Sequence, residues 1–198
     1  MNKIQFRNNL CQTSDNSKKL CPICGTFSEF LPGPNNRLNA RCPTCNSLER
    51  HRFVYLLFNK KFKNIIFNSE IKLLHFAPEE IFHKFFSRLT NIDYYPVDLF
   101  PENFHYKIRD KINMESINYD DNMFDVIYNS HVLEHIPNDI QAMKELYRVL
   151  KPNGYCITLV PINYALKETL EKEEYNTRVK KKILWSRRSF KILCNGYC

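Results

Sequence analysis

Glycine is scarce in this sequence, with 4 residues among 198, and long uninterrupted apolar runs are absent. Lys, Asn, Glu or Asp breaks every apolar stretch before it reaches 18 residues, which excludes a membrane-spanning helix. The first nine residues are polar and basic and lack the apolar core of a secretory signal. We therefore expect a soluble, cytoplasmic protein, without a membrane partner, whose eight cysteines are reduced.

The composition is that of a globular protein with an excess of positive charge. Hydrophobic residues make up 43% of the chain and aromatic residues 14%, which is enough to bury a core. Lys and Arg number 29 against 21 acidic residues, and the resulting net charge of +8 favours a polyanionic partner such as nucleic acid. Several basic residues lie in the C-terminal stretch 180–191, and such a run is more often a solvated tail than a recognition surface. The net charge alone therefore does not assign the partner.

Two Cys-x-x-Cys motifs lie in the first part of the chain. Cys21 and Cys24 are separated from Cys42 and Cys45 by 17 residues, which is a spacing typical of a structural zinc site with four thiolate ligands. The surrounding segment is punctuated by proline and glycine and has no core of its own, so the metal would supply its folding energy. Two disulfides, or unpaired thiols, are the alternative.

The rest of this segment predicts little regular structure. A strand pair formed by residues 27–31 and 38–41 is the most regular element it could hold. Ser47 is a favourable N-cap, and helical spacing of apolar residues predicts a helix over 47–60 that joins two modules. The basic cluster at its start could bind phosphate, or it could be a structural seam in which Glu49 pairs with a neighbouring arginine.

Beyond residue 60, short apolar runs alternate with amphipathic stretches. The runs predict strands at 71–76, 92–98, 124–129 and 154–160. The amphipathic stretches predict helices at 79–89, 139–150 and 164–181. Strand–helix repetition is typical of the Rossmann-like α/β class, with a doubly wound, mostly parallel sheet covered by helices on both faces. Ligands of such folds bind beyond the carboxyl ends of the strands.

Specific sequence lines in this second module resemble a known family. Residues 71–79 read Ile-Lys-Leu-Leu-His-Phe-Ala-Pro-Glu, and Asp98 ends the next predicted strand. Residues 124–135 read Phe-Asp-Val-Ile-Tyr-Asn-Ser-His-Val-Leu-Glu-His, and 145–154 read Glu-Leu-Tyr-Arg-Val-Leu-Lys-Pro-Asn-Gly. Together these lines resemble the class I S-adenosylmethionine-dependent methyltransferases, specifically the methyltransferase type 11 group that carries an N-terminal four-cysteine zinc ribbon.

The resemblance implies S-adenosylmethionine as cofactor, together with the structural zinc, and it assigns residues by position. The first loop would wrap the methionine part of the cofactor, through His75, Phe76, Ala77, Pro78 and Glu79. Asp98 would accept hydrogen bonds from the ribose hydroxyls, and Asn113 stands where the family usually has the aspartate that contacts adenine. Asn129 and Ser130 would line the cofactor, and His131 is the candidate general base toward an unidentified methyl acceptor.

Each assignment has a structural alternative. Asp98 could simply cap the turn that follows it, and His75, His131 and His135 could be structural side chains. Glu134 lies between two of these histidines at metal-ligand spacing, although the resemblance implies no metal there. The first loop also departs from the glycine-rich turn of the wider superfamily, because Ala77 cannot adopt a positive φ without strain.

The predicted organisation is a zinc-ribbon module at 1–46, a linking helix at 47–66, a methyltransferase-like domain at 67–183 and an aberrant basic tail at 184–198. A full domain of this family continues past its fifth strand with a helix and two more strands, which the tail does not supply. We interpret the tail as an out-of-frame reading of a longer gene, which would leave the strand at 154–160 as an exposed sheet edge. The expected function is methyl transfer impaired by this truncation. The alternative is a catalytically degenerate zinc-ribbon binding module for nucleic acid.

Overall fold

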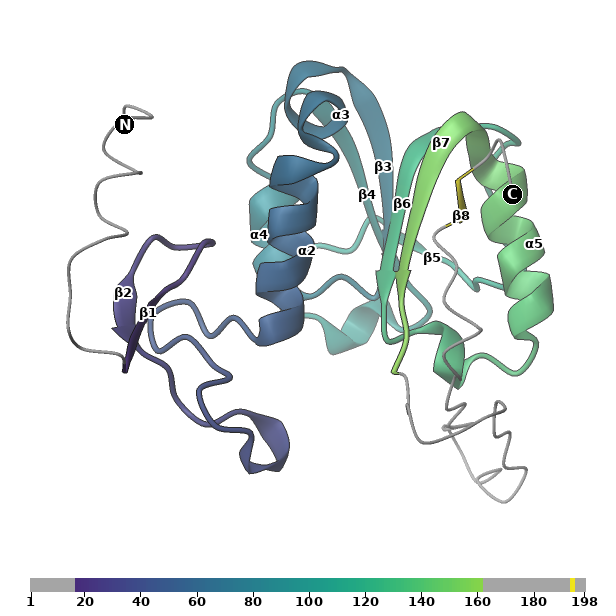
Figure 1. Ribbon diagram of the computed structural model, residues 1–198. Coiled ribbons are helices and arrows are strands. Elements are labelled where there is room, and N and C mark those ends of the chain that lie inside the picture. Colours follow the sequence, from purple (N-terminus) through teal and green to yellow (C-terminus); the bar gives the residue numbers. More distant parts are fainter. Residues whose placement is uncertain (1–16, 162–192, 195–198) are drawn as a thin grey trace. The chain divides into compact units, whose positions relative to one another are not determined.

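The computed structural model describes residues 17–161 and 193–194 of the chain (Figure 1). The chain divides into two compact units, Met1–Lys63 (unit 1) and Asn64–Cys198 (unit 2). This division lies inside the segment predicted as a linking helix. Within the described ranges, no helix is both long enough and apolar enough to cross a membrane.

Unit 1 contains a short strand pair followed by a helix. β1 (Lys18–Leu20) and β2 (Phe27–Glu29) pair in antiparallel fashion, and a 3-10 turn, η1, spans Pro34–Asn36. α2 (Glu49–Lys60) is the long helix of this unit, and α3 (Lys63–Asn68) follows it. The regular structure of unit 1 is thus largely one helix, as expected for a loop-rich module.

The prediction that residues 27–29 pair with the strand at 38–41 is wrong. β2 pairs with β1, whereas the predicted strand at 38–41 contributes only one antiparallel bridge, between Leu31 and Arg41. The physical reason is the backbone between them, in which Asn35, Asn36 and Asn39 all have left-handed φ values between 53° and 58°. Residues in this conformation cannot continue an extended ladder.

Unit 2 is built on one sheet with the strand order β5-β4-β3-β6-β7-β8. The strands are β3 (Ile71–Phe76), β4 (Ile92–Asp98), β5 (Asp110–Lys111), β6 (Phe124–Ser130), β7 (Leu150–Leu159) and β8 (Leu193–Cys194). All neighbouring pairs are parallel except β7 with β8. The predicted parallel α/β class is confirmed.

Helices cover both faces of this sheet, with α4 (Glu80–Phe86) on one side and α5 (Asp139–Val149) on the other (Figure 1). Strand alternation explains the arrangement, because neighbouring residues of a strand face opposite sides. On β3, Leu74 belongs to the apolar cluster that contains α5 residues, whereas the His75 ring contacts Phe86 of α4. Two shorter turns, η2 (Pro101–Asn103) and η3 (Leu133–His135), follow β4 and β6.

The C-terminal edge of the sheet differs from the expectation of a bare strand. Leu193 and Cys194 of β8 pair with Cys156 and Tyr155 of β7, so the backbone of β7 has a partner at that point. The pairing is antiparallel and covers two residues. The predicted helix at 164–181 and most of the predicted basic tail lie outside the described residues.

Candidate functional site

The four cysteines of unit 1 converge. Their Sγ atoms all lie within 4.8 Å of one another, and all four are free thiols. The Sγ atoms of Cys21 and Cys45 are 3.6 Å apart, and those of Cys24 and Cys42 are 3.7 Å apart. Sulfurs bonded at about 2.3 Å to one tetrahedral zinc are about 3.8 Å apart, whereas a disulfide requires about 2.0 Å. The donor set therefore fits a single tetrahedral ion, and it does not fit the disulfide alternative.

Two equivalent backbone turns present these sulfurs. The Gly25 N–H donates to the Cys21 carbonyl at 2.8 Å, and the Asn46 N–H donates to the Cys42 carbonyl at 3.0 Å. Gly25 has φ 73° and Asn46 has φ 57°, which are left-handed values that these two residue types tolerate best. Each Cys-x-x-Cys motif thus closes on itself in the same way, as a metal-binding knuckle requires.

Ser47 is placed differently from the prediction. Its buried Oγ lies 3.4 Å from Cys21 Sγ and 3.2 Å from Cys45 Sγ. α2 instead begins at Glu49, and the Leu48 N–H donates to His51 Nδ1 at 3.1 Å at the start of the helix. A hydroxyl that can donate to a thiolate stabilises the charged, metal-binding form of the sulfur.

The basic cluster at the start of α2 is partly structural. The Arg52 guanidinium donates to the carbonyls of Ser47 and Ala40 at 2.6 and 2.9 Å and lies over the Phe30 ring. Glu49 forms an ion pair with Arg37, at 3.4 Å. Arg52 therefore ties both ends of the second cysteine loop and the Phe30 ring to the helix.

A second candidate site lies at the carboxyl ends of the parallel strands of unit 2. Phe76 at the end of β3 is in register with Val97 of β4 and with Asn129 of β6. The residues that follow these three in sequence, namely Ala77, Asp98 and Ser130, therefore stand in one row at this edge of the sheet. The structure thus brings together three of the predicted cofactor-binding positions.

The chain turns sharply at this edge through two strained residues. Ala77 has φ 46° and His131 has φ 56°, and both are non-glycine residues in the left-handed region. The Ala77 N–H donates to the Val97 carbonyl at 3.0 Å, and the His131 N–H donates to the Leu159 carbonyl at 2.8 Å. Each such residue costs about 1–2 kcal/mol, and such strain is typical of functional sites. Ala77 therefore makes the tight turn without glycine, at the expected cost in strain.

Asp98 is half-buried and already has one backbone partner. Its Oδ1 accepts a hydrogen bond from the Phe100 N–H at 2.7 Å, which is the turn-capping contact named as the alternative. Burial raises the pKa of Asp98, the backbone N–H of Phe100 opposes this shift, and the charge of Glu102 adds to it. The capping contact uses one carboxylate oxygen, and the predicted ribose contact remains a prediction.

His75 lies in the core. It is fully buried, its Nδ1 is 2.8 Å from the Tyr94 hydroxyl, and its ring packs 4.8 Å from that of Tyr128. Burial lowers the pKa of His75 to about 3, so the ring is neutral. Phe76 is also buried, in the cluster on the opposite face of the sheet. The contacts of His75 support its structural alternative.

The remaining residues of the first loop are held by two tyrosines. The Tyr106 hydroxyl donates to the Pro78 carbonyl, and the Tyr128 hydroxyl lies 3.4 Å from Glu79 Oε2. Burial and the neighbouring carboxylates raise the pKa of Tyr106 to about 12, so it remains a donor. The sequence carried no signal for the role of Tyr106.

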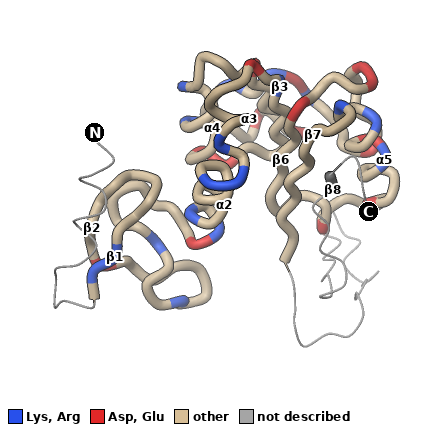
Figure 2. The backbone as a smooth tube through the Cα atoms, turned by 45° about the horizontal axis from the view of Figure 1, so that its top comes forward, with Lys and Arg blue, Asp and Glu red and all other residues tan. Residues whose placement is uncertain are grey.

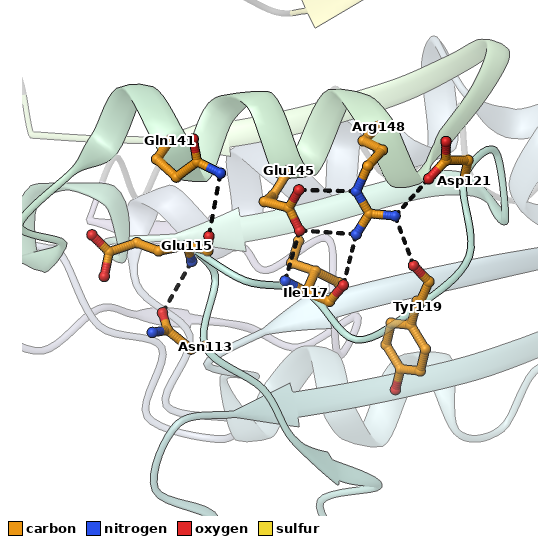
Figure 3. A network of polar contacts seen from close by, with 8 residues as sticks. All are labelled: Asn113, Glu115, Ile117, Tyr119, Asp121, Gln141, Glu145 and Arg148. Atoms are coloured by element: carbon orange, nitrogen blue, oxygen red, sulfur yellow. Dashed lines mark hydrogen bonds and ion pairs between the residues drawn. The ribbon is translucent and has the colours of Figure 1, made fainter.

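Asn113 lies exposed in a turn after β5. Its Oδ1 accepts from the Glu115 N–H at 3.0 Å (Figure 3). An isolated antiparallel bridge also joins Asn113 to Ser116. The side chain therefore stabilises its own turn in the structure. The predicted adenine contact remains a prediction and would fall to the second lone pair of the amide oxygen.

The end of β6 contains buried polar atoms with unused hydrogen-bonding capacity. Asn129 and Ser130 are buried, and Asn129 Nδ2 donates to Thr158 Oγ1 at 3.0 Å. Asn129 Oδ1, Ser130 Oγ and Glu134 Oε2 have no hydrogen-bond partner among the described residues. Buried polar atoms are rarely left unpaired, so these atoms fit a site that a polar ligand completes. Sequence reasoning assigned Asn129 and Ser130 here but gave Glu134 no role beyond its metal-like spacing.

The chain matches known proteins over this same region. Residues 77–158 match a family model described as a methyltransferase domain. A 47-residue segment is 43% identical to the ubiquinone/menaquinone biosynthesis C-methyltransferase UbiE of Hydrogenovibrio crunogenus. That segment is 24% of this chain, and it spans only 18% of the curated relative.

Solved structures similar to this chain share little sequence with it. The PH0226 protein of Pyrococcus horikoshii is 16% identical, with a TM-score of 0.43, over 73% of this chain and 80% of that one. A SAM-dependent methyltransferase of Aquifex aeolicus is 15% identical, with a TM-score of 0.40, over 57% of this chain and 72% of that one.

The parallel sheet and the polar row at its carboxyl edge place unit 2 in the Rossmann-like class of ligand-binding α/β domains. Within that class, residues 77–158 of unit 2 are similar to the family described as a methyltransferase domain.

Proposed function

We propose that the protein transfers a methyl group from S-adenosylmethionine to an acceptor at the carboxyl edge of the unit 2 sheet. The observation that carries the proposal is the row formed by Ala77, Asp98 and Ser130 inside the matched methyltransferase region. Strained backbone and unpartnered buried polar atoms lie at this edge. Both features support a ligand site there.

The residues have separate roles in this proposal. The turn at Ala77 brings backbone close to the methionine part of the cofactor, and the second oxygen of Asp98 accepts from ribose hydroxyls. Asn129 and Ser130 offer their unpartnered oxygens to the ligand. S-adenosylmethionine supplies the methyl group as an electrophile on a positively charged sulfur. The protein supplies position, which accounts for much of the acceleration in reactions between two bound molecules.

Calorimetric titration with S-adenosylhomocysteine tests this function. We expect one site per chain with the wild-type protein. Asp98→Asn keeps an oxygen for the Phe100 N–H but loses the charge that strengthens the ribose contacts. Such charge-assisted hydrogen bonds contribute about 1.5–3 kcal/mol each, so the dissociation constant should rise at least about tenfold.

Asp120→Ala serves as the matched control, because Asp120 is an exposed aspartate in a loop of the same unit. Its affinity should equal that of the wild type. Unchanged affinity in folded Asp98→Asn protein would leave Asp98 as a turn cap alone. Absence of any binding by folded wild-type protein would instead favour the degenerate binding module.

We propose that the four cysteines of unit 1 hold one structural zinc ion. The sulfur separations of 3.6 and 3.7 Å support a tetrahedral set of four thiolates. Since all four positions are then filled by protein ligands, the ion folds unit 1 and takes no part in the reaction. Elemental analysis of purified protein should give one zinc per chain, and Cys42→Ser should lose it.

A specific observation favours nucleic acid as the partner of unit 1. Lys and Arg number nine and Asp and Glu number two within residues 17–63, whereas residues 64–161 contain nine basic and fourteen acidic residues. Figure 2 shows this charge along the backbone of the described residues. The positive charge therefore belongs to unit 1, and it supports the proposal that this unit binds a polyanion.

A further inference from the structure

Glu134 is a buried carboxylate at the carboxyl edge of unit 2 that the sequence did not assign to catalysis. Its exposure is 2%, and it lies in η3, directly after the strained His131. Its Oε1 lies 3.0 Å from His131 Nδ1, and its Oε2 is buried without a hydrogen-bond partner among the described residues. A buried carboxylate is costly unless it is paired, so its place here calls for a function.

The contact between the two side chains links the charge of Glu134 to the tautomer of His131. With Glu134 ionised, its oxygens can only accept, so the 3.0 Å contact then places a proton on His131 Nδ1. In the neutral ring Nε2 then carries the lone pair. The His131 side chain is 44% exposed whereas that of Glu134 is 3% exposed, so the histidine is the member of the pair that a ligand can reach.

We propose that His131 and Glu134 form a proton-accepting pair for the methyl acceptor, with Glu134 as the positioning residue and Nε2 of His131 as the base. This inference rests on the proposed methyl transfer. It also limits the acceptor to groups that must lose a proton, of which we assign a hydroxyl oxygen, aliphatic or phenolic, because it is a weak nucleophile until its proton is removed. A neutral amine has a free lone pair and needs no such base.

The proton balance of the step is complete. The acceptor oxygen forms the new bond to the methyl carbon as the bond from that carbon to sulfur breaks, with its electron pair remaining on sulfur and neutral S-adenosylhomocysteine as the leaving group. The O–H bond of the acceptor breaks with its electron pair remaining on oxygen. The proton moves to His131 Nε2, and the resulting imidazolium is stabilised by the Glu134 carboxylate at 3.0 Å. The unpartnered oxygens of Asn129 and Ser130 lie at the same strand end and can accept from the other polar groups of the ligand.

The tautomer of His131, read from its ring ¹⁵N shifts in the full-length protein, tests the pair directly. In the wild type we expect the proton on Nδ1. Glu134→Gln can donate from its amide nitrogen to Nδ1, so the proton should move to Nε2 and the base should be lost. Glu70→Gln, an exposed glutamate of the same unit, should leave the tautomer unchanged. A proton on Nε2 in the wild type would overturn the proposal, whether or not the Gln variant folds.

The acceptor class is tested by adding phenol to the complex with S-adenosylhomocysteine. Phenol should shift the His131 Nε2 signal in the wild type and not in Glu134→Gln. No shift in the wild type would overturn the hydroxyl assignment. Affinity for S-adenosylhomocysteine should change less than about threefold in Glu134→Gln, which is within about 0.7 kcal/mol. If the wild type did not bind S-adenosylhomocysteine, that result would contradict the proposed function itself. The tautomer of His131 would still test the pair in that case.

Discussion

A single polar contact supports the proposed binding group at each candidate site. In unit 1 the Ser47 hydroxyl lies 3.2 and 3.4 Å from two cysteine sulfurs, and in unit 2 Glu134 lies 3.0 Å from His131. Neither Ser47 nor Glu134 would itself bind metal or methyl acceptor. Each instead sets the charge or tautomer of the group that does. Such supporting contacts typically change affinity or activity by 10–100-fold.

Removal of the Ser47 hydroxyl should weaken metal binding. In Ser47→Ala the Cys21 and Cys45 sulfurs lose contact with a hydroxyl whose single proton can be donated to either thiolate, whereas the backbone contact from Cys42 N–H to the carbonyl of residue 47 is retained. We expect zinc affinity to fall about tenfold, as competition with a chromophoric chelator would measure. Ser116→Ala, an exposed serine of unit 2, is the matched control. Equal affinity of both variants would show that the hydroxyl does not support the thiolates.

Residue positions were predictable where spacing or strand order determined them. The cysteines converge because each motif is a closed local turn, and Asp98 reaches the carboxyl edge because it ends a strand. The burial of the His75 side chain follows from alternation along β3, which directs the ring toward α4. The role of Ser47 could not be predicted, because its position also suits an N-cap, and the choice depends on how the two knuckles fold together.

At the scale of elements, one arginine joins α5 to the chain between β5 and β6. The Arg148 guanidinium donates to both oxygens of Glu145 at 2.9 and 2.8 Å, and to the carbonyls of Ile117 and Tyr119 at 2.7 and 2.9 Å (Figure 3). It also pairs with Asp121 at 2.6 Å. Five contacts from one planar group hold a segment that has no regular structure of its own.

Loss of this contact set should destabilise unit 2. In Arg148→Met the half-buried Glu145 and two backbone carbonyls lose their partner. Because Arg148 is 32% exposed and water compensates in part, we expect a loss of about 2 kcal/mol in the free energy of unfolding, measured with urea. Lys144→Met removes the charge of an exposed residue on the same helix, and it should change the free energy of unfolding by less than about 0.5 kcal/mol.

The ion pair between Arg148 and Glu145 also makes the stability of unit 2 depend on pH, and the sign of this dependence follows from the pKa of Glu145. The hydrogen bonds from Arg148 lower the pKa of Glu145, so the charged carboxylate stabilises the folded state above the ordinary carboxyl range. That stability is lost as the pH falls through the lowered value. The difference between wild type and Arg148→Met should therefore shrink below about pH 4, without vanishing, because the contacts to the carbonyls remain. A difference that is constant from pH 7 to 3 would contradict this assignment.

Elements were predicted well where hydrophobic pattern alone decides them. The bounds of β3 and β4 are those predicted, and α5 ends one residue earlier than predicted. The pairing of β2 was not predictable in this way, because three asparagines with left-handed backbone decide it. Asparagine in a sequence permits this conformation without requiring it.

At the scale of the whole molecule, charge is divided between the two units. Unit 1 contains eleven basic and three acidic residues over positions 1–63. Its net charge is therefore +8, which equals the net charge of the entire chain. The C-terminal basic run is balanced by acidic residues elsewhere in unit 2, so unit 2 as a whole carries no net charge. A zinc ion with four thiolates would add two negative charges, and unit 1 would still be strongly positive. Exposed aromatic rings, Phe27 at 48% and Phe53 at 60%, lie among these charges.

Unit 1 should bind single-stranded nucleic acid through its charge and these rings. We expect an RNA oligonucleotide to bind the zinc-loaded, full-length protein with an affinity that falls about tenfold or more between 50 and 200 mM salt, for about three phosphate contacts. Fluorescence anisotropy at several salt concentrations would measure this affinity.

The exposed Lys19 and Arg41 carry two of the positive charges of unit 1. The double variant Lys19→Ala with Arg41→Ala should therefore reduce the slope of log affinity against log salt concentration by about 1.4. Lys107→Ala with Lys111→Ala removes the same charge from unit 2 and should leave the slope unchanged. Equal effects of the two double variants would mean that the protein attracts RNA through net charge alone, without a surface on unit 1.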